Sequence, residues 1–291
     1  MTQGRYAFLG TRRWLGIIAV VVLISIVCAL LGYWQLTRYQ SRAEQVNLVE
    51  TNYDAEPVPM AQLLDSPDAE LAPDDEWLPV QVTGRYVGQA MVLPQRGVAG
   101  SPADHVVAMF ATSDLGGEGD LILVDRGWYR TDSFAEHPRA RDLPEGELQV
   151  VLRLRTAEAP SPRDLAEGQV HSLNPGQVRA RALEQEADDA GLVSGVYGML
   201  ASEQQQGSST LPAELELLPR PPADLGSHLS YAFQWWVFSA GALVGLVILA
   251  RREAAGMPIE RGPQRRTKEG DDEDAQIDAQ LDRPHAPSKG A

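Results

Sequence analysis

Cysteine and lysine are almost missing from this chain of 291 residues, and each shortage excludes a kind of site. Cys28 is the single cysteine, so one chain can form no disulfide, no Cys-x-x-Cys redox pair and no cysteine-based zinc site. Lys268 and Lys289 are the only lysines, so the lysine of a phosphate-binding loop is missing from the preceding 267 residues. The net charge of −15 argues against nucleic-acid binding, which requires a basic surface.

Recognisable catalytic signatures are missing as well. Residues 191–195 come nearest to a Gly-x-Ser-x-Gly elbow but have the wrong spacing. His105, His137 and His171 are widely spaced and form no His-Glu-x-x-His pair of metal ligands. Asp104 and His105 are adjacent and form at most half of an acid–base pair, so we interpret His105 as a surface or strand-end histidine. We therefore expect a protein that is not an enzyme.

Two long apolar runs contain no charged residue, residues 14–34 and residues 231–250. A helix of about 20 residues crosses the ~30 Å hydrocarbon core of a bilayer. The first run is either a cleaved signal or a retained span. A signal has an apolar region of about 7–15 residues and a small-x-small cleavage site, and neither matches this run. We predict transmembrane helices over residues 14–36 and 228–250.

The basic residues around the second run predict the topology. Arg220 is the single basic residue in the ~15 residues before it, whereas six follow it: Arg251, Arg252, Arg261, Arg265, Arg266 and Lys268. Residues 1–13 and 251–291 are therefore expected in the cytoplasm, the latter as a disordered tail. Residues 37–227 are expected outside a cell membrane, with 14 arginines and 31 acidic residues.

The segment between the runs is typical of short strands, with period-2 alternation at 78–86 and 148–156 and apolar runs at 106–112 and 121–124. We predict strands at these residues: 78–86, 90–93, 106–112, 121–129, 148–156, 196–202 and 215–218. Gly88-Gln89 is interpreted as a two-residue hairpin, 178–189 as a helix, and 38–52 as a helical continuation of the first span. The fold class is thus an α+β membrane protein with two transmembrane helices flanking an extracytoplasmic, mainly antiparallel β domain, either a sheet or a small open barrel.

Two smaller patterns lead to further expectations. Asp125-Arg126 follows four strand hydrophobics, and we interpret it as a turn with an internal ion pair in preference to a binding site. Gly241 and Gly245 form a Gly-x-x-x-Gly pair in the second span, which together with Gly16 and Gly32 in the first allows close helix packing or contact with a partner subunit.

His228 and Gln234 lie at the entrance of the second span, where polar groups are costly and tend to face a partner or a ligand. A neutral imidazole at an interface is a good axial ligand for haem iron, and the neighbouring Tyr231, Trp235 and Trp236 suit a porphyrin face. The alternative is a helix-start histidine that hydrogen-bonds the backbone or a lipid headgroup.

Four motifs together resemble the Surfeit-locus-one (Shy-type) family of cytochrome c oxidase assembly factors. They are Leu-Gly-Tyr-Trp-Gln-Leu-Thr-Arg at 31–38, Gly-Arg-Tyr at 84–86, Val-Asp-Arg-Gly-Trp at 124–128 and His-Leu-Ser-Tyr-Ala-Phe-Gln-Trp-Trp at 228–236. The resemblance covers residues 13–252 and departs from the family at Asp125, where Asn is usual, and at residues 103–110. It implies a non-enzymatic chaperone that helps haem a reach the oxidase catalytic subunit, with that subunit and the haem a synthesis machinery as partners. It also implies haem binding through His228.

An antiparallel helix pair would bring the end of the first span beside the start of the second. We therefore expect Trp34 and Gln35 to close a haem pocket at His228, with Arg38 pairing a propionate and Tyr231 and Gln234 nearby. His105 is the alternative ligand. Two other functions stay open: a structural scaffold that steadies an oxidase subunit without haem, and a membrane-tethered extracytoplasmic hydrolase.

Overall fold

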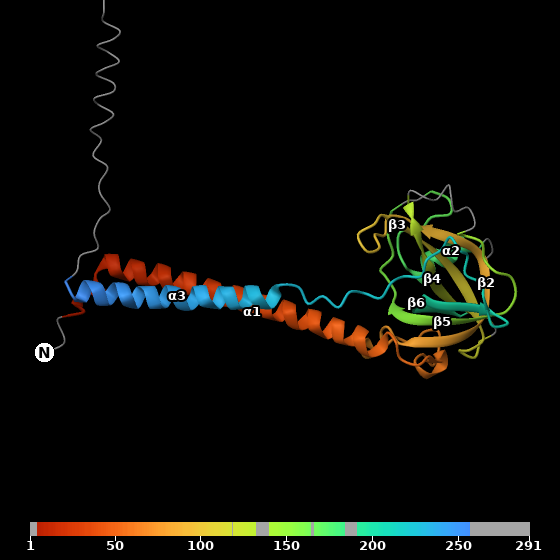
Figure 1. The fold of residues 1–291 in the computed structure, drawn as a ribbon, viewed down its shortest axis with the longest axis horizontal. Coiled ribbons are helices and arrows are strands. Elements are labelled where there is room, and N and C mark those ends of the chain that lie inside the picture. The colour runs from red at the N-terminus through yellow and green to blue at the C-terminus, as the bar shows by residue number, and fades with distance from the viewer. Residues whose placement is uncertain (1–4, 118, 132–139, 164–165, 184–190, 257–291) are drawn as a thin grey trace, which may run out of the picture. The chain divides into compact units, whose positions relative to one another are not determined.

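The computed structural model describes residues 5–117, 119–131, 140–163, 166–183 and 191–256 (Figure 1). The chain divides into a helical unit, residues 1–34 with 230–291, and a β unit, residues 35–229. The helices are α1 (Arg12–Asn52), α2 (Pro175–Ala182) and α3 (His228–Ala254), with short 3-10 helices at Ala7–Gly10, Met60–Gln62 and Pro73–Asp75. The strands are β1 (Val58–Pro59), β2 (Pro79–Leu93), β3 (Ala103–Thr112), β4 (Asp120–Arg130), β5 (Leu148–Thr156), β6 (Leu192–Gln205) and β7 (Ser208–Ser209).

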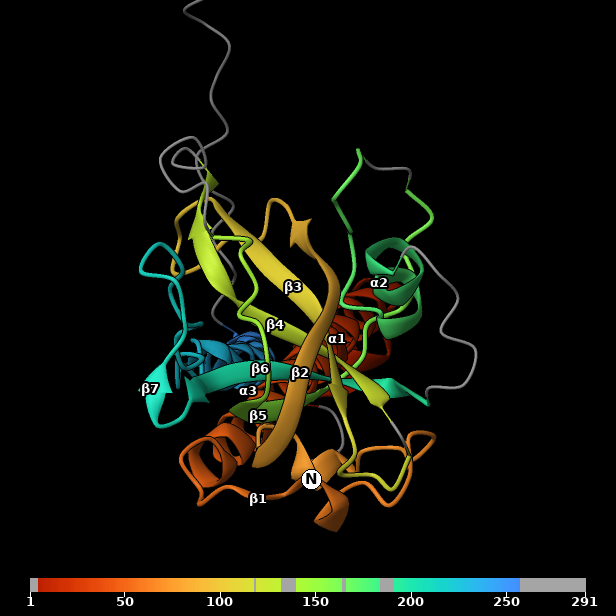
Figure 2. The same ribbon diagram turned by 90° about the vertical axis from the view of Figure 1, so that its right-hand side faces the viewer.

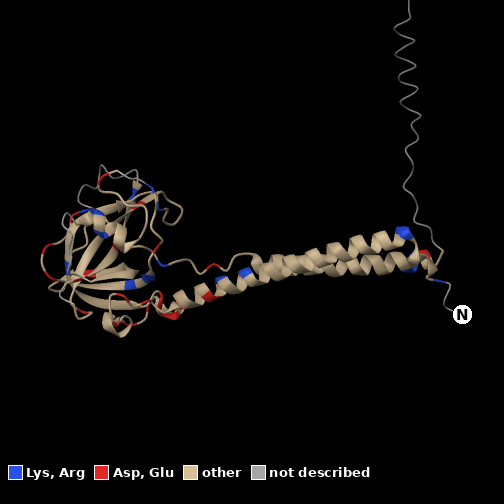
Figure 3. Cartoon of the chain, turned by 180° about the vertical axis from the view of Figure 1, so that it is seen from behind, with Lys and Arg blue, Asp and Glu red and all other residues tan. Residues whose placement is uncertain are grey.

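The helical unit pairs the first part of α1 with α3, and both helices are long and apolar enough to span a membrane. Residues 14–34 and 231–250 contain no charged residue, and charged residues of this unit are coloured only beyond them, at the end of the pair (Figure 3). Its polar contact is reciprocal: Ser239 Oγ donates to Ser25 O at 2.9 Å, and Ser25 Oγ lies 3.1 Å from Ser239 O. At one end of the pair, Trp14 Nε1 donates to Glu253 Oε1 at 3.3 Å. The expected pairing of the two apolar helices is therefore present.

The Gly-x-x-x-Gly pair does not make that contact. A Cβ atom at Gly241 or Gly245 would meet nothing within 4 Å, whereas one at Gly32 would lie 2.4 Å from Trp236 Nε1. Gly241 follows the buried Ala232 by nine residues, which is two and a half helical turns, so it lies on the opposite face of α3. The expectation that Gly241 and Gly245 pack against the first helix is wrong.

The β unit closes into a ring of paired strands (Figure 2). The order is β1-β2-β3-β4-β6-β5, and β5 pairs again with β2. The β4–β6 and β1–β2 pairs are parallel and the others antiparallel, so the sheet is mixed and the expectation of a mainly antiparallel one is wrong. The reason is connectivity. After β4 the chain passes through β5 and α2 before β6, which returns along β4 in the same direction, and alternation within a strand does not report such a crossover.

One long strand, β2, replaces the predicted hairpin at Gly88-Gln89. Gly88 has φ +70° and lies where the β2–β3 register shifts between Val87 and Met91, which marks a bulge. A glycine with positive φ suits both a tight turn and a bulge, so the local sequence did not separate them. The bulge leaves room for α2, because a Cβ atom at Gly88 would approach Ala182 O to 2.3 Å.

Most other predicted elements are present with shifted ends. Strands 106–112, 121–129, 148–156 and 196–202 correspond to β3, β4, β5 and β6, and α1 continues to Asn52 as expected. Residues 215–218 form no strand, only a bridge between Glu216 and Trp128. The predicted helix 178–189 corresponds to α2, with 184–190 outside the described residues. The predicted disordered tail lies mostly at 257–291, also outside them.

Both faces of β3 are buried, which explains its nearly continuous apolar sequence. Val106 and Phe110 point into a core with the inward residues of the other strands. Val107 and Met109 point the other way, into a second core that includes Val178 of α2. A strand buried on both faces loses the alternation of a half-exposed one.

Asp125 and Arg126 form neither a turn nor an ion pair with one another. Both lie inside β4, where successive side chains point to opposite faces. Asp125 meets His105, whereas the fully buried Arg126 binds Glu203 through Nε at 3.1 Å and Nη2 at 2.9 Å. The predicted internal ion pair is wrong because strand geometry separates the two side chains.

Candidate functional site

His228 opens α3 and is held by α1. Its Nδ1 lies 2.9 Å from Gln35 Oε1. With the amide oxygen as acceptor, Nδ1 carries the proton and Nε2 keeps the lone pair that a metal ion would use. The His228 side chain is half-buried, so its ring is fixed on one edge and accessible on another.

The segment that leads to His228 runs along the last part of α1 in the opposite direction. Arg220 Nη1 donates to Asp54 Oδ2 at 2.6 Å, and further along Arg42 Nε donates to the carbonyl of Asp224 at 2.9 Å. As the segment runs from Arg220 to His228, its partners run backwards, from Asp54 just past the end of α1 to Arg42 and then Gln35. These contacts bring the chain to His228 already aligned with the helix that carries Gln35, so the imidazole is positioned by more than one bond.

A glycine next to this histidine keeps its Nε2 edge open. Gly226 has φ +65°, and a Cβ atom there would lie 3.4 Å from Cδ2 and 3.6 Å from Nε2 of His228. The backbone turn is fixed by Asp224, whose Oδ1 accepts from Gly226 N at 2.8 Å. A larger side chain at 226 would therefore lie against the edge that carries the lone pair.

The structure joins two of the six predicted site residues, His228 and Gln35, by a hydrogen bond. Arg38 is exposed on α1, past the end of the apolar run. The remaining three belong to the helical unit, where their side chains are exposed: Trp34, Tyr231 and Gln234.

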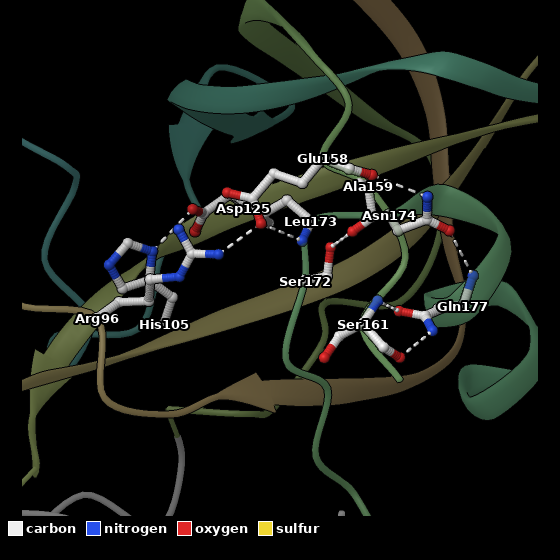
Figure 4. Close-up of polar contacts among 10 residues, drawn as sticks. All are labelled: Arg96, His105, Asp125, Glu158, Ala159, Ser161, Ser172, Leu173, Asn174 and Gln177. Atoms are coloured by element: carbon white, nitrogen blue, oxygen red, sulfur yellow. Dashed lines mark hydrogen bonds and ion pairs between the residues drawn. The ribbon is translucent and has the colours of Figure 1, made fainter. Parts of the chain in front are cut away.

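A second histidine, His105, has a carboxylate partner that sequence reasoning missed (Figure 4). Its Nδ1 lies 2.8 Å from Asp125 Oδ2, and only 7% of the residue is exposed. The interpretation of His105 as a surface residue is wrong. The β3–β4 register places Val107 opposite Asp125, which brings Asp125 within reach of His105, and the His105–Asp125 pair is buried. His105 Nε2 is buried and has no hydrogen-bond partner among the described residues. The apolar sequences of both strands were the available signal, but they did not give the strand register.

Around this pair, polar contacts fasten the connection between β5 and α2 to the sheet (Figure 4). Arg96 forms an ion pair with Glu158, whose carboxylate also accepts from Leu173 N at 3.0 Å. Burial by itself would raise the pKa of the Glu158 carboxyl, but the hydrogen bonds from Arg96 and Leu173 hold that pKa below its usual range. Asn174 Nδ2 donates to Glu158 O at 2.9 Å. These contacts are structural.

No group of three or more His, Cys, Asp or Glu side chains suited to a metal ion occurs in the described parts of the chain. A bare ion such as zinc needs about four protein ligands. Haem iron takes four nitrogens from its porphyrin and needs only an axial ligand from the protein. The donor set at His228, one imidazole with a fixed Nδ1, therefore fits haem and does not fit a bare zinc ion.

Comparison with known proteins assigns the family. The SURF1 family matches residues 22–240. An uncharacterized SURF1-like protein of Mycobacterium tuberculosis is 34% identical over 269 residues, which cover 87% of this chain and 92% of the relative. A SURF1-like protein of Monosiga brevicollis is 26% identical over 277 residues, covering 88% of this chain and 96% of that protein. The chain therefore belongs to the SURF1 family, known generally as cytochrome oxidase assembly factors.

Proposed function

We propose that this protein is a membrane assembly factor for cytochrome c oxidase that holds haem a through His228 and assists its delivery to the catalytic subunit. The observation that carries the proposal is the hydrogen bond between His228 Nδ1 and Gln35 Oε1. Histidines that ligate metals generally donate their other ring N–H to an oxygen, which fixes the tautomer and the orientation of the ring. The partners proposed are the oxidase catalytic subunit and the haem a synthesis machinery.

Burial favours His228 over His105 as the proposed ligand. Both His228 and His105 have Nδ1 against an oxygen. His105 Nε2 is buried, so a porphyrin could reach it only by opening the sheet. His228 is half-buried beside Gly226, with its Nε2 edge unobstructed by any side chain at that position.

Arg38 also belongs to the β unit, and its role follows from its chemistry, because a guanidinium pairs well with a propionate. When bound, haem a would supply the iron that His228 coordinates, and the protein would bind and orient it without chemical change.

We propose that both termini are cytoplasmic and that the β unit lies outside the cell membrane. Support comes from the two apolar helices and the excess of arginine after the second. Cysteines introduced at Ser101 and Ser288 test this in intact cells, because an impermeant reagent is expected to label only the first. Labelling of the second alone would overturn the topology.

The test of haem binding uses the full chain, purified in detergent and loaded with haem. We expect a Soret band in the wild type that His228→Ala loses, while His171→Ala, a half-buried histidine elsewhere in the β unit, keeps it. Gly226→Asn is the sharper variant, because asparagine tolerates positive φ but places bulk beside Nε2, so haem affinity is expected to fall with His228 intact. A His228→Ala protein with full Soret absorbance would exclude this ligand.

A scaffold that steadies an oxidase subunit without haem is the second candidate. The same His228–Gln35 bond favours it, because that bond also anchors the start of α3 to α1. Absence of any Soret band in the wild type, together with undiminished co-purification of the oxidase subunit, would select this function. We do not propose the hydrolase, since no hydroxyl or thiol among the described residues hydrogen-bonds His105 Nε2.

A further inference from the structure

A cavity of about 240 Å³ lies within the β unit, and the haem proposal leaves it unassigned. One wall is the stretch of α1 from Arg42 to Glu50, another is Glu76 with Trp77, and Arg155 and the segment beginning at Arg220 complete it. Three arginines therefore surround one small space. Valines of α1 and two prolines after Arg220 add an apolar surface.

The three arginines differ in how far their charge is compensated. Arg155 lies 3.5 Å from Glu76, and Arg220 pairs with Asp54 at 2.6 Å. Arg42 contacts only neutral acceptors among the described residues, the carbonyl of Asp224 at 2.9 Å and Gln45 Oε1 at 3.4 Å. Its guanidinium thus brings a positive charge to the cavity wall that no contacting carboxylate compensates. Glu50 and Glu76 also line the cavity, and Glu76 is the partner of Arg155.

Trp77 lies in the cavity wall with an unfavourable backbone conformation. Its φ of 72° is rare for an aromatic residue, and it is 9% exposed. Asn52 Nδ2 fixes the preceding loop by donating to Asp74 O at 2.7 Å and Glu76 O at 2.8 Å. The result is an indole ring 3.7 Å below the guanidinium carbon of Arg155, which keeps that cation at the cavity.

We propose that this cavity binds the oxyanion head group, a carboxylate or a phosphate, of an amphipathic molecule, with Arg42 as its main anchor. Guanidinium forms paired hydrogen bonds with both oxyanions. The volume excludes a whole porphyrin, because pockets for drug-sized ligands measure about 300–1,000 Å³. A head group fits, and the apolar wall suits the first atoms of its body. The site stands whether or not His228 binds haem.

Two probes distinguish the sources of such a head group. Metal-free protoporphyrin IX carries two propionates and no iron for His228, and its dimethyl ester removes the carboxylates. A short-chain phosphatidylglycerol, used below its micelle concentration, presents a phosphate. Each is titrated into the full chain in uncharged detergent, and the dissociation constant is measured by fluorescence for the porphyrin and by calorimetry for the lipid.

We expect at least one probe to bind about tenfold more weakly to Arg42→Gln and to Arg155→Gln than to wild type, while Arg85→Gln binds unchanged. Arg85 is the matched control, an exposed arginine on β2 that does not line this cavity. Loss of protoporphyrin binding on esterification identifies a carboxylate, and an effect confined to phosphatidylglycerol identifies a phosphate. Equal affinities in wild type and both cavity variants, or an equal loss in Arg85→Gln, would overturn the proposal.

Discussion

Replacing Glu203 with glutamine is expected to destabilise the β unit more than any surface change of the same kind. The Glu203 carboxylate is buried and accepts four hydrogen bonds. Two come from Arg126, at 3.1 and 2.9 Å, one from Tyr86 Oη at 2.6 Å and one from Thr210 Oγ1 at 2.9 Å. Burial and the Glu203 carboxylate raise the pKa of the Tyr86 hydroxyl well above its usual value, so Tyr86 stays a donor.

The magnitude follows from what the variant leaves behind. Glu203→Gln keeps the size of the side chain but removes the charge that compensates the fully buried guanidinium of Arg126. Removing one partner of a buried ion pair costs about 3–5 kcal/mol. For a unit of this size, each kcal/mol lowers Tm by about 2–4 °C, so we expect a fall of roughly 6–20 °C.

The assay is thermal and urea unfolding of the full chain in detergent, monitored by far-UV circular dichroism. Glu147→Gln is the control, because Glu147 is exposed at the start of β5. Replacing the whole buried group, Arg126→Met with Glu203→Leu and Tyr86→Phe, is expected to recover most of the lost stability, since neither a charge nor the Tyr86 hydroxyl then remains buried without a partner. A Glu203→Gln protein within about 1 kcal/mol of wild type, or a triple variant no better than the single, would refute the reasoning.

Two further predictions concern other contacts. Gly32→Leu is expected to separate the apolar helices, since the new side chain would collide with a tryptophan of α3, whereas Gly245→Leu is expected to leave them paired. Disulfide crosslinking of cysteines placed at Ser25 and Ser239 measures the pairing, and equal crosslinking in both variants would contradict the prediction. The pKa of Glu158 is lowered in the folded chain, so its ion pair stabilises above the unfolded pKa of about 4.3 and is lost as pH falls through the lower folded value. The exchange protection of the Glu158 and Leu173 amides, corrected for the intrinsic pH dependence of exchange, is therefore expected to fall on acidification, and Glu158→Gln to remove much of that pH dependence. An unchanged protection profile would count against it.

The sequence by itself determined the elements whose physics is local. Residues 14–34 and 231–250 are apolar and uncharged over about 20 residues, and both are helices long and apolar enough to span a membrane. The strand at β5 followed from alternation, the strand at β4 from its apolar run, and the continuation of α1 to Asn52 from the lack of glycine and proline after residue 37. The family was equally readable, because four short motifs already resembled the family whose match covers residues 22–240.

Only the tertiary structure decided which distant side chains meet. Asp125 and Arg126 are neighbours in sequence, yet one reaches His105, 20 residues away, and the other reaches Glu203, 77 residues away. The parallel β4–β6 pairing and the bulge at Gly88 were likewise undetermined. Periodicity tells which residues are buried, but strand register and direction depend on how the ring closes, which no local window contains.

The candidate site divides in the same way. The positions of His228 and of the 31–38 motif at the ends of two apolar runs made their proximity predictable, and His228 does bond Gln35. The cavity lined by three arginines was not predictable, because Arg42, Trp77, Arg155 and Arg220 come from four separate stretches of the β unit. Such a site exists only once α1, β5 and the segment before α3 have packed, since long-range packing alone brings those side chains within reach of one ligand.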